Sequence, residues 1–85
     1  MRIRDPQPGA LPEPERVPIR DSSIRLGQFL KLANLAEDGA EARELVVGGD
    51  VRVNGQTETR RGRQLTTGDR VDVAGPAGER SAVVG

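Results

Sequence analysis

The chain has 85 residues, equal numbers of basic and acidic side chains, and neither cysteine nor histidine. This length allows one small domain with little room for a catalytic cleft and its supporting shell, so we expect a binding module and no enzyme. The missing residue types exclude disulfides, thiolate chemistry, imidazole bases and the usual zinc sites, and the zero net charge excludes a polybasic or acidic tail protein.

The first sixteen residues are predicted to form a disordered or polyproline-like tail. Five of the six prolines fall within the first eighteen residues, among charged residues and almost no large apolar ones. Such a segment buries too little apolar surface to offset the entropy lost on ordering. The folded domain is therefore expected over residues 17–85, with a short edge strand at Val17–Arg20.

A first amphipathic helix is predicted from Leu26 to about Leu35. Its apolar stripe recurs at helical spacing and comprises Leu26, Phe29, Leu30 and Ala33. Leu32 and Leu35 lie off this stripe, so the helix is expected to bury two faces. Phe29 is the only aromatic residue of the chain and is expected at the centre of a small core.

A second helix is predicted to begin near Gly39, with Ala42, Leu45 and Val46 on its buried side. Asp38 is suited to cap its first turn, and Glu41, three residues later, can complete a capping box. The pair Gly48-Gly49 supplies the left-handed conformation that commonly ends a helix. Two short helices joined by a tight turn are therefore expected.

In the rest of the chain, short segments alternate apolar and polar residues with a period of two, which predicts strands. The pair Asn54-Gly55, a strong hairpin signal, separates a strand at Val51–Val53 from a return strand at Gln56–Glu58. Two more strands are predicted, each after a glycine-containing turn: Val71–Val73 after Thr67–Asp69, and Ser81–Val84 after Gly75–Gly78. The predicted fold class is α+β, with two short packed helices followed by a small twisted antiparallel sheet.

Charge is distributed unevenly along the chain despite the zero total. Acidic residues outnumber basic ones in residues 21–50, and basic residues outnumber acidic ones in residues 51–70. Three arginines fall within the loop Arg60-Arg61-Gly62-Arg63, where their side chains can fan out toward phosphates. A loop that merely keeps the protein soluble is the alternative explanation.

The predicted helices add further polar and cationic side chains. Neither Lys31 nor Arg43 has an acidic residue three or four positions away in its own helix, so a local salt bridge does not explain them. Arg25, Gln28 and Lys31 share one side of the first helix, opposite its apolar stripe. This side is either part of a binding surface or an ordinary solvated face.

Several motifs together resemble one known family. They are A-x-A-R-x-L at Ala40–Leu45, V-x-V-N-G at Val51–Gly55 and G-D-x-V at Gly68–Val71. The combination resembles the RNA-binding domain named after small-subunit ribosomal protein four, the S-four domain or alpha-L motif. Ile24–Ala33 and Glu58–Arg63 are similar to the small stand-alone bacterial members, and the resemblance spans residues 24–73.

The resemblance implies two helices packed on a small sheet and non-enzymatic binding of structured RNA, commonly ribosomal or transfer RNA. It therefore also implies a role in translation. By position, the implied RNA contacts come from the helix faces and the adjacent loop: Arg25, Gln28, Lys31, Arg43, Arg52, Arg60, Arg61 and Arg63. We expect no cofactor, no small-molecule substrate and a monomeric protein.

A cytoplasmic location is expected, without membrane attachment. The longest aliphatic run, Leu45–Val47, is far shorter than the roughly 20 apolar residues of a membrane helix. The first six residues, Met1–Pro6, also lack the apolar region of a secretory signal.

With Phe29 needed in the core, no exposed aromatic platform is available to stack unpaired bases. The expected mechanism is therefore recognition of RNA shape and backbone by arginine, whose planar fork binds phosphates in bidentate fashion. The alternative is a protein-interaction adaptor that uses the same basic loop against an acidic partner. Its binding would survive nuclease treatment.

Overall fold

The structure is a computed structural model that describes residues 14–75 and 78–85. Along the chain it contains β1 (Glu15–Val17), β2 (Ile24–Arg25), α1 (Leu26–Leu32), α2 (Gly39–Val47), β3 (Val51–Val53), β4 (Gln56–Thr57), β5 (Gln64–Leu65), β6 (Arg70–Gly75) and β7 (Gly78–Val84). Most of the predicted tail, residues 1–13, lies outside the described residues, as does the middle of the predicted turn at Gly75–Gly78.

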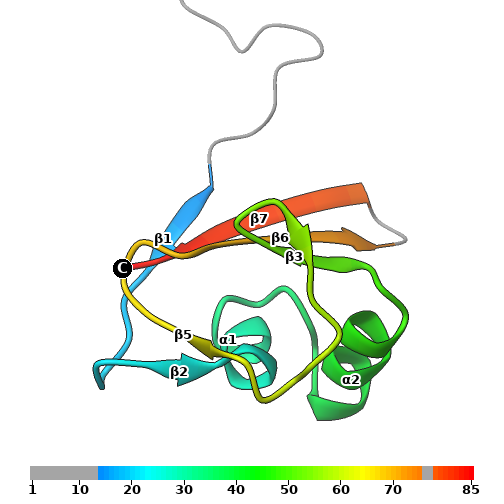
Figure 1. Cartoon of the computed structure of the whole chain (residues 1–85), viewed down its shortest axis with the longest axis horizontal. Helices are drawn as coiled ribbons and strands as arrows, with labels where there is room; N and C mark the ends of the chain where they lie inside the picture. Colours follow the sequence, from blue (N-terminus) through cyan, green and yellow to red (C-terminus); the bar gives the residue numbers. More distant parts are fainter. Residues whose placement is uncertain (1–13, 76–77) are drawn as a thin grey trace, which may run out of the picture.

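A five-stranded sheet in the order β1-β7-β6-β3-β4 forms one layer, and both helices lie on the same face of it (Figure 1). Its longest ladder joins β6 and β7, from Arg70 opposite Val83 to Gly75 opposite Gly78. A second, two-stranded sheet pairs β2 with β5. The predicted α+β class is confirmed, and both predicted hairpin strands, β3 and β4, are present.

The structure corrects the predictions for the start of the domain and for the strand directions. Glu15 and Arg16, predicted to lie in the tail, form β1 together with Val17. Strand β1 runs parallel to β7, so the sheet is mixed and not purely antiparallel. The Gly85 N–H donates to the Val17 carbonyl at 2.8 Å. The edge strand predicted at Val17–Arg20 overlaps β1 only at Val17. Local pattern does not place its bounds because its partner lies at the far end of the chain and Val17 is its only buried side chain.

The core lies between the sheet and the helices. Valines on alternate positions of β3 and β6 face inward, while Arg52 and Asp72 between them face outward. Phe29 is 0% exposed, which confirms its predicted central position. The largest fully buried side chains are Phe29, Leu26, Leu30, Leu65, Val46, Val51, Val53, Val71 and Val84.

Helix α1 ends at Leu32, three residues earlier than predicted. Asn34 adopts a left-handed conformation (φ 61°), and the Leu35 N–H donates back to the Leu30 carbonyl at 2.8 Å. This turn brings Leu35 into the core from outside the helix. The predicted second buried face is wrong, because Leu32 is 53% exposed.

Helix α2 confirms Asp38 as the predicted cap, whereas Glu41 accepts one residue before the position that a capping box requires. The Glu41 N–H donates to Asp38 Oδ1 at 2.8 Å, and Glu41 Oε1 in turn accepts from the Glu37 N–H at 2.6 Å. At the other end Gly49 takes a positive φ of 81°, which permits the hydrogen bond from the Asp50 N–H to the Leu45 carbonyl at 3.0 Å.

Two turns carry motif residues and are joined directly to each other. Asn54 Nδ2 donates to Asp69 Oδ1 at 3.0 Å, and the Arg70 N–H donates to Asn54 Oδ1 at 2.9 Å. The Thr66 N–H donates to Asp69 Oδ2 at 2.9 Å and is the main reason that the pKa of Asp69 is lowered. Asn54 and Asp69 are therefore structural residues that fix the β3–β4 hairpin against the start of β6.

We predict that Phe29→Ala lowers the free energy of unfolding by about 3 to 5 kcal/mol, because it leaves a cavity where the helices meet the sheet. Leu32→Ala in the same helix is the matched control, and it should change stability by less than about 0.5 kcal/mol because its side chain is half exposed. Urea denaturation of both variants measures the difference. Equal losses would mean that Phe29 is not the centre of the core.

Candidate nucleic-acid interface

The loop between β4 and β5 is held against the start of helix α1 by its main chain. The Leu26 N–H donates to the Arg63 carbonyl at 2.8 Å, and the Gly27 N–H donates to the Arg61 carbonyl at 3.0 Å. These two N–H groups belong to the first turn of α1, where no intrahelical acceptor exists. The loop therefore caps the helix and fixes its own position relative to the helix face.

A buried carboxylate fixes the side chains of the same loop. Glu58 is 7% exposed, and its two carboxylate oxygens accept from Arg60 Nε at 3.0 Å and from Arg63 Nη1 at 3.1 Å. The hydrogen bond from Arg60 lowers the pKa of Glu58 to about 2, against the opposing effect of burial and with the help of Arg63. Two of the three loop arginines are therefore engaged within the protein.

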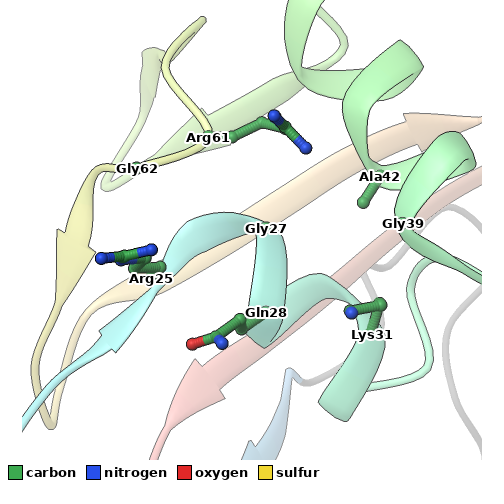
Figure 2. Close-up of a pocket in the computed structure, with 8 residues that line it drawn as sticks. All are labelled: Arg25, Gly27, Gln28, Lys31, Gly39, Ala42, Arg61 and Gly62. Atoms are coloured by element: carbon green, nitrogen blue, oxygen red, sulfur yellow. The ribbon is translucent and has the colours of Figure 1, made fainter.

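The third loop arginine lies at a pocket of about 240 Å³ between α1, α2 and the loop. Figure 2 shows the Arg61 side chain extending from the loop toward Ala42 on α2. Lys31 and Gln28 come from α1, and Arg25 from the end of β2 just before it. The complete lining is Arg25, Gly27, Gln28, Lys31, Gly39, Ala42, Arg61 and Gly62.

The structure thus brings together four of the eight residues predicted as contacts, Arg25, Gln28, Lys31 and Arg61. The other four do not line this pocket. Arg43 is exposed on α2 beside Ala42, and Arg52 lies on the outer face of the sheet with Nη2 2.6 Å from Glu79 Oε2. Arg60 and Arg63 pair with Glu58, although Arg60 remains 78% exposed and within reach of a ligand.

Sequence reasoning missed two kinds of residue at this site. The sequence predicts Glu58 in a return strand, and only the fold shows that this residue lies in the β4–β5 loop and is buried. Gly27, Gly39 and Gly62 were not singled out, because glycines without a nucleotide-binding pattern carry no local signal of their own. Their shared position at one pocket is visible only in three dimensions.

The chemistry available at this pocket is that of anion binding. Three cationic groups and one amide line it, and none of its lining residues is acidic. Within residues 14–75 and 78–85, no group of three or more His, Cys, Asp or Glu side chains is placed to hold a metal ion. No helix in the described part of the chain is long and apolar enough to cross a membrane.

We predict that Glu58→Gln destabilises the protein at pH 7 by about 1 to 3 kcal/mol, because it removes the charge that Arg60 and Arg63 bind. The pKa of Glu58 falls on folding from 4.5 to about 2, so its charge contributes fully above pH 4.5 and this contribution is lost as the pH falls toward 2. The stability difference between wild type and variant should therefore shrink over that interval.

Thermal unfolding across this pH range measures the difference between the two proteins. Glu79→Gln is the matched control, since Glu79 forms an ion pair with Arg52 in which both side chains are about half exposed, and its loss should matter little. A destabilisation by Glu58→Gln that stays constant down to pH 2 would show that the Glu58 charge is not responsible.

Comparison with known proteins agrees with this architecture and with the sequence motifs. The model of the S4 domain family matches residues 17–82, which is most of the chain. A relative from Bacillus subtilis (strain 168), named probable ribosome maturation protein RlbA, is 41% identical over 59 residues, covering 69% of this chain and 83% of that protein. With two helices on a mixed sheet and a family match over nearly its whole folded part, the chain belongs to the S4 family of RNA-binding domains.

Proposed function

We propose that this protein binds structured RNA without catalysing a reaction, and that ribosomal or transfer RNA is its target. The binding surface is the pocket between α1, α2 and the β4–β5 loop, with Arg25, Gln28, Lys31 and Arg61 as the central contacts. The observation that carries this proposal is the convergence of three cations on a pocket without an acidic lining residue. The relative named as a probable ribosome maturation protein favours ribosomal RNA.

Recognition by this surface would rest on phosphates and shape. The only aromatic side chain, Phe29, is 0% exposed and therefore unavailable for stacking on bases. Arginine and lysine bind phosphates whatever the base sequence, whereas a fixed spacing of cations selects a particular path of the RNA backbone. The loop holds that spacing through its two main-chain hydrogen bonds to α1.

The remaining predicted contacts would act at the margin of the surface. Arg43 is exposed and adjacent to Ala42 in α2, so it extends the positive surface beyond the pocket. Arg60 and Arg63 keep positive potential near the loop while their charge is partly compensated by Glu58. Arg52, paired with Glu79, is the weakest member of the predicted set.

The central test is a salt titration of binding to deproteinised bacterial ribosomal RNA and to bulk transfer RNA. We predict that Lys31→Gln with Arg61→Gln lowers the affinity. The slope of log affinity against log salt should also shrink by about 0.7 to 0.9 for each phosphate that the variant no longer neutralises. Circular dichroism checks folding, which should be retained because both side chains are exposed.

The matched control is Arg16→Gln with Arg80→Gln, which removes the same charge from strands β1 and β7. This control should keep the wild-type salt slope. If the pocket variant and the control variant bind RNA equally, the pocket is not the RNA site. Arg43→Glu provides a third comparison and should weaken binding if the surface continues along α2.

Crosslinking in cells, followed by sequencing of the recovered RNA, identifies the target. Recovery of ribosomal RNA supports the proposal, and its loss on Lys31→Gln with Arg61→Gln ties the target to the pocket. A protein partner that stays bound after nuclease treatment, with no RNA recovered, would instead favour an adaptor that binds an acidic protein.

A further inference from the structure

The glycines of this chain divide into those that the fold requires and those that it does not. Gly49 and Gly55 have φ angles of 81° and 87°, a region that side chains other than glycine rarely adopt. At Gly48, a Cβ atom would lie 2.9 Å from the Glu44 carbonyl oxygen, which is too close. Backbone conformation or packing therefore explains glycine at these positions.

Neither reason applies to the three glycines at the cationic pocket. A Cβ atom on Gly27 would lie 3.6 Å from Arg61 Cβ, an ordinary contact, and one on Gly39 or Gly62 would meet nothing within 4 Å. None of the three has a positive φ. Gly27 and Gly39 lie in the first turns of α1 and α2, and neither ends its helix as Gly49 does for α2. The fold alone would accept alanine at all three positions.

These glycines come from three separate segments that meet at the cations. Gly27 belongs to α1, Gly39 to α2 and Gly62 to the β4–β5 loop, yet all three line the pocket formed with Arg25, Lys31 and Arg61. Figure 2 shows Gly27 near the centre of this group of residues. The wall of the pocket therefore has no side chain at three positions, one in each segment.

We propose that these glycines keep the pocket floor bare so that one RNA strand lies with its sugar-phosphate backbone directly on the protein main chain. This inference rests on the proposed function and specifies which part of the RNA occupies the pocket. Lys31 and Arg61 neutralise the phosphates, and the absent side chains allow the close approach. The absence of side chains at these three positions is thus a steric requirement for binding, in addition to the electrostatic requirement for the cations.

The lining favours a phosphodiester backbone over a base as the occupant. No aromatic side chain lines the pocket, and Gln28 is its only neutral polar side chain. The donors that face a phosphate here are therefore the side chains of Arg25, Lys31 and Arg61.

The test replaces each pocket glycine singly by alanine and measures binding to the same ribosomal and transfer RNA probes. Gly27→Ala, Gly39→Ala and Gly62→Ala should keep or raise the thermal midpoint, while the affinity for RNA falls by about tenfold because the added methyl group holds the RNA backbone away from the pocket. Gly39→Leu, whose Cβ atom would meet nothing within 4 Å in the free protein, should weaken binding further because its side chain is larger. Gly75→Ala, whose Cβ atom has its nearest neighbour at 4.0 Å, is the matched control outside the pocket.

The outcomes separate this inference from the proposed function. The alanine variants and Gly39→Leu could bind RNA as tightly as the wild type while Lys31→Gln with Arg61→Gln still binds weakly. In that case the proposed role of the glycines is wrong, and the pocket remains the RNA-binding site. If the charge variant also binds normally, the RNA site itself is wrong. Loss of binding by Gly75→Ala equal to that of the pocket variants would overturn the assignment of the effect to the pocket.

Discussion

The burial of one carboxylate governs the geometry of the cationic surface. Glu58, the first residue of the β4–β5 loop, has 7% of its surface exposed, and a buried charge is costly unless it is paired. Arg60 and Arg63 turn back to satisfy it. Arg61 lies between them in sequence, forms no ion pair within the described residues, and lines the pocket instead. The different roles of the three loop arginines thus follow from a single interior charge.

Zero net charge is compatible with an anion-binding surface because acidic and basic side chains are separated in the fold. The acidic residues Asp38 and Glu41 are engaged in capping α2. On the outer face of the sheet, Arg52 and Arg70 are paired with acidic partners. At the pocket, by contrast, no acidic residue lines the wall. The electrostatic potential at a bound phosphate therefore depends on the charged side chains near it. It does not depend on the net charge of the chain.

The strand and turn motifs of the family do not contain the cationic residues that line the pocket. Asn54 and Asp69, from the V-x-V-N-G and G-D-x-V motifs, bond to each other and hold two turns together. Their contribution is to the sheet, which positions the helices but does not line the pocket. Lys31 and Arg61, which line the proposed contact surface, lie instead in Ile24–Ala33 and Glu58–Arg63, the segments similar to the small stand-alone bacterial members. Similarity in the motifs therefore reports the scaffold more directly than the binding chemistry.

Local features were determined by the sequence alone: the capped second helix, the Asn54-Gly55 hairpin and the central position of Phe29. Each depends on interactions among residues a few positions apart or on the scarcity of large apolar side chains. The tertiary structure decided the parallel pairing of β1 with β7, the exposure of Leu32 and the burial of Glu58. It also selected four of the eight predicted contacts for one pocket. These features depend on segments distant in sequence, whose approach is fixed only when the helices pack on the sheet.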